Sequence, residues 1–314
     1  MPGASWPAAG WPEPHPGEAP MYLTVTANSA LDRVYFIDSF SPGTRMLASR
    51  CVESVGGKGF DASVALRALN LPTTALGFVA GQNGQTLVRL LERYAITHDL
   101  VWVEGETRVA LVIVEQAHQR HSHIIAGGYA VPPSAQADLI QRFTAHLPHA
   151  QWVILAGSLP QGVAGDFYAR LITLAHRAEI PVLVDCPGEP ALHAAAARPT
   201  ILKMNAQEFH QTFGVSPASS TALAQQALEI RRSFGLPALV ITCGEEGMIA
   251  STDAGTFHAL PPRQPVVNAA GAGDATSAAL AWRLSLGDPW PEALRWAAAT
   301  GAATVLTEGT ADCH

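Results

Sequence analysis

Short apolar runs alternate with segments of helical periodicity along most of the chain. Runs typical of buried strands lie at residues 22–26, 152–156, 182–185, 200–203 and 238–242. Segments with apolar residues at helical spacing lie between such runs, as at residues 166–177 and 220–234. Strands that alternate with helices form a mainly parallel sheet with helices on both faces. The pattern therefore predicts an α/β fold in three layers around one central sheet.

Two regions interrupt this alternation, because strand-like runs follow one another there without helices. They lie at about residues 33–54 and 108–125, and a small separate sheet is the simplest explanation. Residues 1–20 hold six prolines, three glycines and two tryptophans without periodicity, which is typical of a flexible tail. We therefore expect a tail at 1–20 and one folded unit over 21–314.

A turn of small residues near the C-terminus carries the clearest chemical signal. We expect an apolar strand at residues 265–267 to end there, before a helix that follows. The turn and the first helical residues are Ala270, Gly271, Ala272, Gly273 and Asp274. Small side chains let backbone N–H groups approach an anion, and a helix N-terminus favours negative charge. A carboxylate beside such an anion site can remove a proton, as phosphoryl transfer requires. The alternative for Asp274 is a helix N-cap after a glycine-rich turn.

A second glycine-rich element lies far upstream and also precedes a helical stretch. Its residues are Gly56, Gly57, Lys58, Gly59, Phe60 and Asp61. Between the two elements lie further polar positions at the ends of apolar runs, namely Asn205, Glu208, Thr242 and Gly244. The chain contains neither a P-loop motif nor a G-x-G-x-x-G motif after the first strand. The nucleotide-binding motifs of P-loop and dinucleotide-binding proteins are therefore not favoured.

This ordered series resembles the ribokinase-like, PfkB-type carbohydrate kinases over residues 22–310. Within that family, segments 26–32 and 157–160 are most similar to the branch of 1-phosphofructokinase and tagatose-6-phosphate kinase. The resemblance implies a ribokinase-like three-layer domain. It also implies that the small sheet is a β-lid over the sugar, formed by about 33–54 and 108–125, through which a homodimer can form.

The resemblance implies ATP and Mg²⁺ as cofactors and a sugar as the partner substrate. Asp274 would be the catalytic base, while N–H groups of the turn from Ala270 to Gly273 would stabilise the transferring group. Asn205 and Glu208 would order Mg²⁺ through water, and the alternative for this pair is a polar helix start. Thr242 and Gly244, together with Asn205, Ala270, Gly271 and Gly273, would contact the nucleotide.

The acceptor site implied by the resemblance contains Asp32, Gly56, Gly57, Lys58, Asp61 and Arg108. An exposed ion pair with Arg33 is the alternative for Asp32. The chain departs here from its nearest branch, which has basic or amide residues where this sequence has Leu47, Val52, Ala110 and Val112, and asparagine in place of Asp61. Fewer donors and an added carboxylate disfavour a dianionic substrate. Arg108, with Arg45 or Arg50, remains a candidate phosphate anchor.

Composition restricts the remaining functions. The 314 residues are 48% hydrophobic and 14% charged, with a net charge of -7, which suits a large apolar core and gives no basic surface for nucleic acid or membrane. Neither a membrane-spanning run nor a signal peptide is evident, so we expect a cytoplasmic protein. The four cysteines lack paired spacing, so we expect reduced thiols.

Two alternatives for the function stay open. They are a nucleoside kinase, with a base pocket from Tyr35, Phe36 and Phe40, and a non-catalytic sugar or nucleotide sensor.

Overall fold

The computed structural model describes residues 21–118, 120–215 and 219–313. The expected tail at 1–20 lies outside the described residues. Within them, nine strands form the main sheet in the order β13-β12-β11-β10-β9-β8-β1-β4-β5. Neighbouring strands from β11 to β5 are parallel, and β12 and β13 add antiparallel pairs at one edge. Their bounds are β1 Met21–Thr26, β4 Thr73–Val79, β5 Thr97–Trp102, β8 Ala150–Ala156, β9 Val182–Asp185, β10 Ile201–Asn205, β11 Ala238–Thr242, β12 Met248–Thr252 and β13 Gly255–Ala259.

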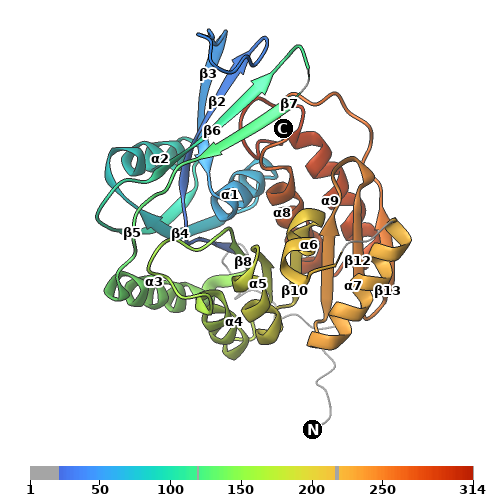
Figure 1. The fold of residues 1–314 in the computed structure, drawn as a ribbon. Coiled ribbons are helices and arrows are strands. Elements are labelled where there is room, and N and C mark those ends of the chain that lie inside the picture. Colours follow the sequence, from blue (N-terminus) through green and yellow to red (C-terminus); the bar gives the residue numbers. More distant parts are fainter. Residues whose placement is uncertain (1–20, 119, 216–218, 314) are drawn as a thin grey trace.

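Helices cover both faces of this sheet, so the expected three-layer α/β fold is confirmed (Figure 1). Their bounds are α1 Lys58–Ala68, α2 Gly81–Arg93, α3 Pro133–His146, α4 Phe167–Arg177, α5 Glu189–Ala197, α6 Ala206–Phe213, α7 Ser220–Phe234, α8 Ala272–Ser285 and α9 Trp290–Thr304. On one face, α3, α4 and α5 pack against apolar strand residues. On the other face, α1, α8 and α9 pack on the same strands through alanine-rich surfaces, because small side chains allow helices to lie close to the sheet and to one another.

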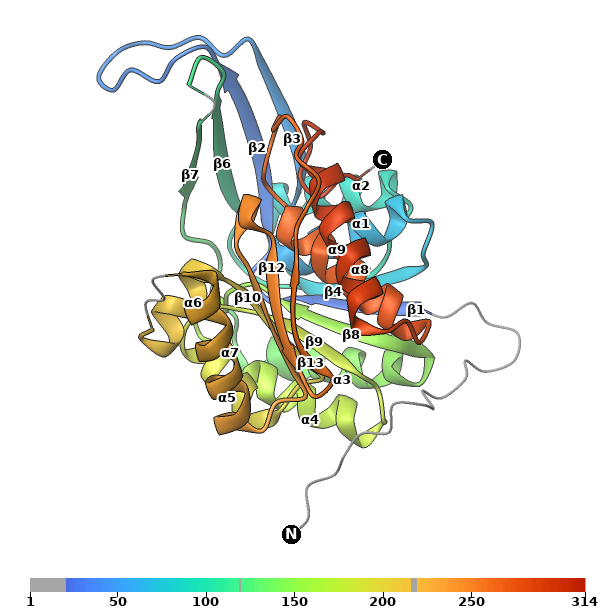
Figure 2. The same ribbon diagram turned by 90° about the vertical axis from the view of Figure 1, so that its right-hand side faces the viewer.

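A second sheet occupies the two regions that lack helical periodicity. Its order is β3-β2-β6-β7, with β2 at Ala30–Ile37, β3 at Arg50–Gly56, β6 at Arg108–Glu115 and β7 at Arg120–Ile125. Figure 2 shows it projecting from the main body. In its register, Ala30 of β2 lies opposite both Gly56 of β3 and Arg108 of β6. The small separate sheet is confirmed, while its action as a lid stays a prediction.

The expected strand at residues 265–267 is wrong, because this segment has no strand pairing. Val266 is exposed, whereas Val267 packs against the apolar cluster of the second sheet. The backbone N–H of Val267 donates to the carbonyl of Val305 at 2.7 Å. This apolar run therefore lies in a loop that contacts the second sheet through Val267 and the C-terminal segment through the hydrogen bond to Val305.

The fold gathers the ends of distant elements at one place. Strands β9, β10 and β11 are neighbours in the sheet, and their carboxyl ends are Asp185, Asn205 and Thr242. Helices α1 and α8 pack against each other, and each begins after a glycine-rich turn. Polar groups at the carboxyl edge of a parallel sheet and at helix N-termini form ligand sites in open α/β folds. Among the described residues, none of the helices has the length and apolarity needed to cross a bilayer.

Candidate active site

The C-terminal glycine-rich turn is held in a conformation that requires glycine. Gly271 has a φ of 81° and is the N-cap of α8. A Cβ atom at this position would lie 2.3 Å from the backbone nitrogen of Ala311. Asn268 fastens the turn, since its Oδ1 accepts from the N–H of Ala270 at 3.0 Å and its Nδ2 donates to the carbonyl of Glu308 at 3.1 Å. The turn and the helix N-terminus therefore form a fixed frame of backbone N–H groups.

Asp274 is the third residue of α8, so the alternative that it is the N-cap is wrong. Its side chain is buried, with a residue exposure of 7%, and its Oδ1 has no hydrogen-bond partner in the described part of the chain. Burial and the charge of Asp185 raise the pKa of Asp274 to about 7, against the opposing charges of Lys58 and Lys203. A carboxylate with this pKa and an unpaired oxygen is suited to accept a proton at neutral pH.

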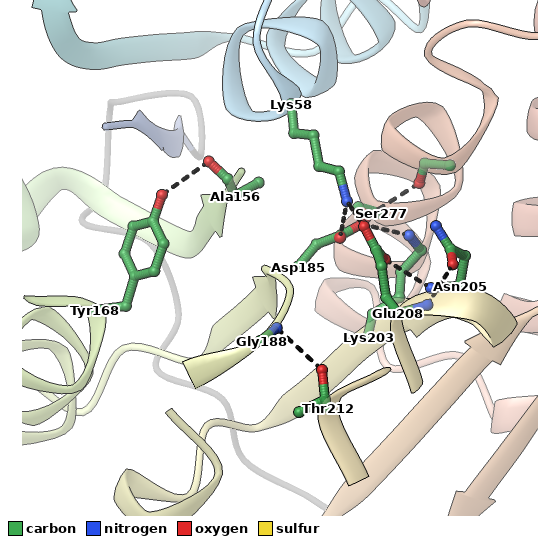
Figure 3. Close-up of polar contacts among 11 residues, drawn as sticks. Lys58, Ala156, Tyr168, Asp185, Gly188, Lys203, Asn205, Glu208, Thr212 and Ser277 are labelled. Atoms are coloured by element: carbon green, nitrogen blue, oxygen red, sulfur yellow. Dashed lines mark hydrogen bonds and ion pairs between the residues drawn. The ribbon is translucent and has the colours of Figure 1, made fainter. Parts of the chain in front are cut away.

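Beside Asp274 lies an ionic cluster that consists of Lys58, Asp185, Lys203 and Glu208 (Figure 3). Lys58 Nζ donates to Asp185 Oδ1 at 2.7 Å and to Glu208 Oε1 at 2.8 Å, and Lys203 Nζ donates to Asp185 Oδ2 at 2.5 Å. Burial opposes ionisation of Asp185, but the charges of Lys203 and Lys58 outweigh it and lower its pKa to about 2. The cluster therefore pairs two ammonium groups with two carboxylates in the interior.

Sequence reasoning missed Asp185 and Lys203, although a signal was present. Both are charged residues inside apolar runs that form buried strands, and a charge at such a position requires a partner. The ammonium group of Lys58 is bound by two carboxylates, and its expected contact with the sugar stays a prediction. A Cβ atom on Gly273 would lie 3.5 Å from Lys203 Nζ, which places that ammonium group directly beneath the glycine-rich turn.

Asn205 and Glu208 form a capping box at the start of α6. Asn205 Oδ1 accepts from the N–H of Glu208 at 2.8 Å, and Glu208 Oε2 accepts from the N–H of Asn205 at 2.9 Å. The polar helix start considered from the sequence is therefore real. The same pair also faces the site, because the charge of Glu208 raises the pKa of Asp274 in addition to the larger effects of burial and Asp185.

A cavity of about 790 Å³ opens next to this capping box. Its lining combines polar loop residues with apolar side chains from α7 and β12, including Asn205, Thr242, Gly244, Leu223, Ile249 and His258. Thr242 and Gly244, which the sequence assigned to the nucleotide, thus lie together with Asn205 in one cavity. Asp274 does not line it, so the cavity and the buried base are adjacent parts of one site rather than a single pocket.

Asp32, on β2, is buried, and its charge acts on Asp61 as that of Asp274 does. Its Oδ2 accepts from the Thr310 hydroxyl at 3.0 Å, and burial raises its pKa to about 7. Gly56 allows this placement, because a Cβ atom there would lie 2.1 Å from Asp32 Oδ1. The exposed pairing with Arg33 is wrong, since Arg33 binds Glu53 at 3.0 Å instead.

Asp61 lies in the first turn of α1, near the carboxyl groups of Asp274 and Asp32. Burial is the largest cause of the raised pKa of Asp61, and the charges of Asp274 and Asp32 raise it further. A backbone hydrogen bond with Gly57 and the charge of Lys58 lower it in part. Its exposure is 4%, and its Oδ1 is unpartnered within the described residues. Gly57, the N-cap of α1, has a φ of 107°. The structure thus brings the carboxyl groups of Asp32, Asp61 and Asp274 near one another in its interior.

Family comparison agrees with this geometry. A family model described as pfkB family carbohydrate kinase matches residues 22–314, almost the whole chain. The chain belongs to the pfkB family. The resemblance seen in the sequence is therefore confirmed, and the protein is a carbohydrate kinase of this family.

Solved structures agree with the pfkB assignment. Phosphofructokinase-2 from Escherichia coli, in complex with potassium, matches with a TM-score of 0.84 and 24% identity, over 94% of this chain and 96% of that chain. A possible 1-phosphofructokinase from Thermotoga maritima matches with a TM-score of 0.83 and 26% identity, over 92% of each chain. The first of these likenesses supports the fold alone. The kinase family, by contrast, rests on the family model.

Proposed function

We propose that this pfkB kinase transfers the γ-phosphoryl group of ATP to a hydroxyl of a sugar, with Asp274 as the general base. The observation that carries the proposal is the buried, unpaired Asp274 carboxylate in the first turn of α8. Its oxygen accepts the proton of the attacking hydroxyl, and backbone N–H groups from Ala270 to Gly273 stabilise charge on the transferring group. Alignment and charge stabilisation are the main requirements of phosphoryl transfer.

The nucleotide occupies the cavity lined by Thr242 and Gly244, so that its phosphates extend toward the glycine-rich turn. Lys203, beneath Gly273, adds positive charge there. Mg²⁺ would be held by the phosphates and, through water, by Asn205 and Glu208, whose oxygen atoms suit a hard cation. Both side chains are already engaged in the capping box, which fits binding through water rather than direct ligation. When bound, Mg²⁺ neutralises charge on the phosphates.

The acceptor sugar lies on the other side of Asp274, against Asp32, Asp61 and the backbone of Gly56. A hydroxyl that donates to Asp61 Oδ1 supplies the partner that this buried oxygen lacks in the described structure. We place Arg108 at the rim of the site, where its Nη2 donates to the carbonyl of Asn28 at 3.2 Å.

The second sheet would act as the lid over this sugar and as a dimer contact. Ile124 and Ile125 on β7 are exposed by 54% and 56%, and apolar side chains of this size favour burial against a second copy. One solved form of Escherichia coli phosphofructokinase-2 is tetrameric. Sedimentation of the full chain tests the dimer. We expect the kinase to act in the cytoplasm, where ATP is available.

The two alternative functions receive less support. Phe36, proposed for a nucleoside-base pocket, is buried in the apolar cluster of the second sheet, and the guanidinium of Arg50 lies 4.2 Å from its ring centroid. It is therefore a packing residue rather than a free stacking surface. A sensor without activity does not need a buried carboxylate with a pKa near neutrality beside an anion-binding turn, and Asp274 is retained here.

The experiment that tests the proposal is a phosphorylation assay with ATP and Mg²⁺ on a panel of sugars, sugar phosphates and nucleosides. Asp274→Asn should lower kcat by roughly a hundredfold or more, because the amide cannot accept a proton. Asp253→Asn is the matched control, since Asp253 is an exposed aspartate that pairs with Arg231. Near wild-type turnover by pure Asp274→Asn protein would reject the base assignment.

A further inference from the structure

The C-terminal segment, residues 305–313, joins two parts of the site. The backbone N–H of Thr310 donates to the hydroxyl of Ser54, on β3, at 3.0 Å. The next N–H, that of Ala311, donates to the carbonyl of Ala270, in the glycine-rich turn, at 3.3 Å. Ala311 is fully buried. The segment therefore connects the second sheet with the turn beside the proposed base.

The backbone of this segment is held in a costly conformation. Ala311 has a φ of 58°, in the left-handed region that alanine rarely adopts. The hydroxyl of Thr307 donates to the carbonyl of Asp312 at 2.9 Å, and Cys313 packs in the apolar cluster between α1 and the sheet. Backbone strain persists only where the surrounding contacts fix it. These contacts therefore also fix the position of the neighbouring residue, Thr310.

The side chain of Thr310 binds Asp32. Its hydroxyl donates to Asp32 Oδ2 at 3.0 Å, and the two residues are 2% and 8% exposed. Water has little access to such a pair, so it cannot easily replace the bond. Gly56 lies against the other carboxylate oxygen, Oδ1, because it has no Cβ atom. The carboxyl group is thus held between Thr310 and Gly56, which restricts its orientation.

Two groups favour the ionised form of Asp32 against the cost of burial. The hydrogen bond from Thr310 lowers the pKa of Asp32 more than the charge of Arg108 does, although burial still leaves this pKa at about 7. Arg108 Nη2 itself donates to the carbonyl of Asn28. Thr310 therefore supports, by direct contact, a carboxylate that accepts hydrogen bonds in its ionised form.

We propose that Thr310 is a positioning residue for the acceptor, and that its hydroxyl holds the Asp32 carboxylate in the orientation that binds the sugar hydroxyls. The inference rests on the proposed kinase function, in which Asp32 contacts the sugar. Thr310 does not line the nucleotide cavity. Its loss should therefore weaken acceptor binding, and should leave ATP binding and the transfer step nearly unchanged.

The test is steady-state kinetics of the full chain at pH 8, with ATP and the sugar or sugar phosphate that wild-type protein phosphorylates with the highest kcat/KM. Thr310→Val removes the hydroxyl and keeps the branched shape. The KM for the acceptor should rise roughly tenfold or more, because a hydrogen bond to a charged group is lost. The kcat and the KM for ATP should change by less than about threefold. Thr310→Ser keeps the hydroxyl and should restore the acceptor KM.

Thr304→Val is the matched control, because Thr304 is fully buried and its hydroxyl donates to the carbonyl of Thr300 within α9 at 3.0 Å. This control should leave the acceptor KM unchanged, and a rise equal to that of Thr310→Val would overturn the inference. If Thr310→Val protein does not fold, Thr310→Ala removes the same hydroxyl with a smaller side chain, and the same result is required.

Three further results would overturn the inference while leaving the kinase function intact. They are an unchanged acceptor KM in Thr310→Val protein, equal rises in the KM values for acceptor and ATP, and a Thr310→Ser variant as impaired as Thr310→Val. If wild-type protein phosphorylates no sugar or sugar phosphate, the proposed function fails, and the inference fails with it. The two kinds of failure are therefore distinct results.

Discussion

Asp274→Asn should stabilise the folded protein at pH 8 while it removes activity. The perturbation replaces a buried carboxylate by a neutral side chain of nearly equal size. Burial and the charge of Asp185 raise the pKa of Asp274 from 3.8 to about 7. The folded state therefore holds this proton over a pH range in which the unfolded state has already released it. Stability falls as pH rises from about 4 to about 7, and the full cost of ionisation is present above pH 7.

The magnitude follows from the same pKa difference. A shift of about three pH units corresponds to about 4 kcal/mol of unfavourable ionisation, which is the upper limit for the gain on neutralising the group. The favourable charges of Lys58 and Lys203 are already included in this pKa. The amide of the variant is itself a buried polar group that costs free energy, so we expect a smaller gain of about 1–3 kcal/mol in the free energy of unfolding at pH 8. At pH 4 the wild-type carboxyl group is protonated in the folded state, and the gain should be close to zero.

Denaturant unfolding of both proteins at pH 4, 6 and 8 measures this difference. The Asp253→Asn control should show no such pH-dependent gain, because Asp253 is exposed and lies outside the site. The same ionisation should govern catalysis, so wild-type kcat/KM should rise with pH through about 7. A variant that is less stable than wild type at pH 8, or whose gain is equal at pH 4 and pH 8, would refute the reasoning. Either result would mean that the Asp274 carboxylate is not held at a cost in the folded state.

Two other substitutions test the metal site and the glycine-rich turn. Glu208→Gln should raise the Mg²⁺ concentration needed for half-maximal activity severalfold. The control Glu189→Gln, in the first turn of α5, should leave this concentration unchanged. Equal Mg²⁺ requirements in the two variants would contradict the role of Glu208. Gly271→Ala should lower the free energy of unfolding by about 2–4 kcal/mol, because a Cβ atom would lie 2.3 Å from Ala311 N. Gly287 has a φ of 80°, and no atom lies near a Cβ added there. Gly287→Ala should therefore lower the free energy of unfolding by only about 1 kcal/mol, as measured by denaturant unfolding. Similar losses in both variants would show that the close approach to Ala311 does not contribute to the cost of Gly271→Ala.

Local patterns in the sequence were sufficient for the main elements. The run at 182–185 has the same bounds as β9, and the helix at 220–234 has the same bounds as α7. These segments are predictable because apolar spacing and glycine turns are properties of neighbouring residues. The glycine-rich turn before Asp274 was found for the same reason, since small residues followed directly by an acidic residue and a helical pattern form a local signal. The pfkB family also follows from such signals in their order.

Only the tertiary structure decided which charges meet. Lys58, Asp185 and Lys203 come from α1, β9 and β10, and the sequence contains no local pattern that joins them. The run at 265–267 looked like a strand, but its apolar residues serve a contact with the second sheet and with Val305. The unpaired oxygen of Asp61 also depends on burial by segments distant in the chain. Periodicity determines which elements form, whereas ionisation and pairing depend on distances between residues that only chain folding brings together.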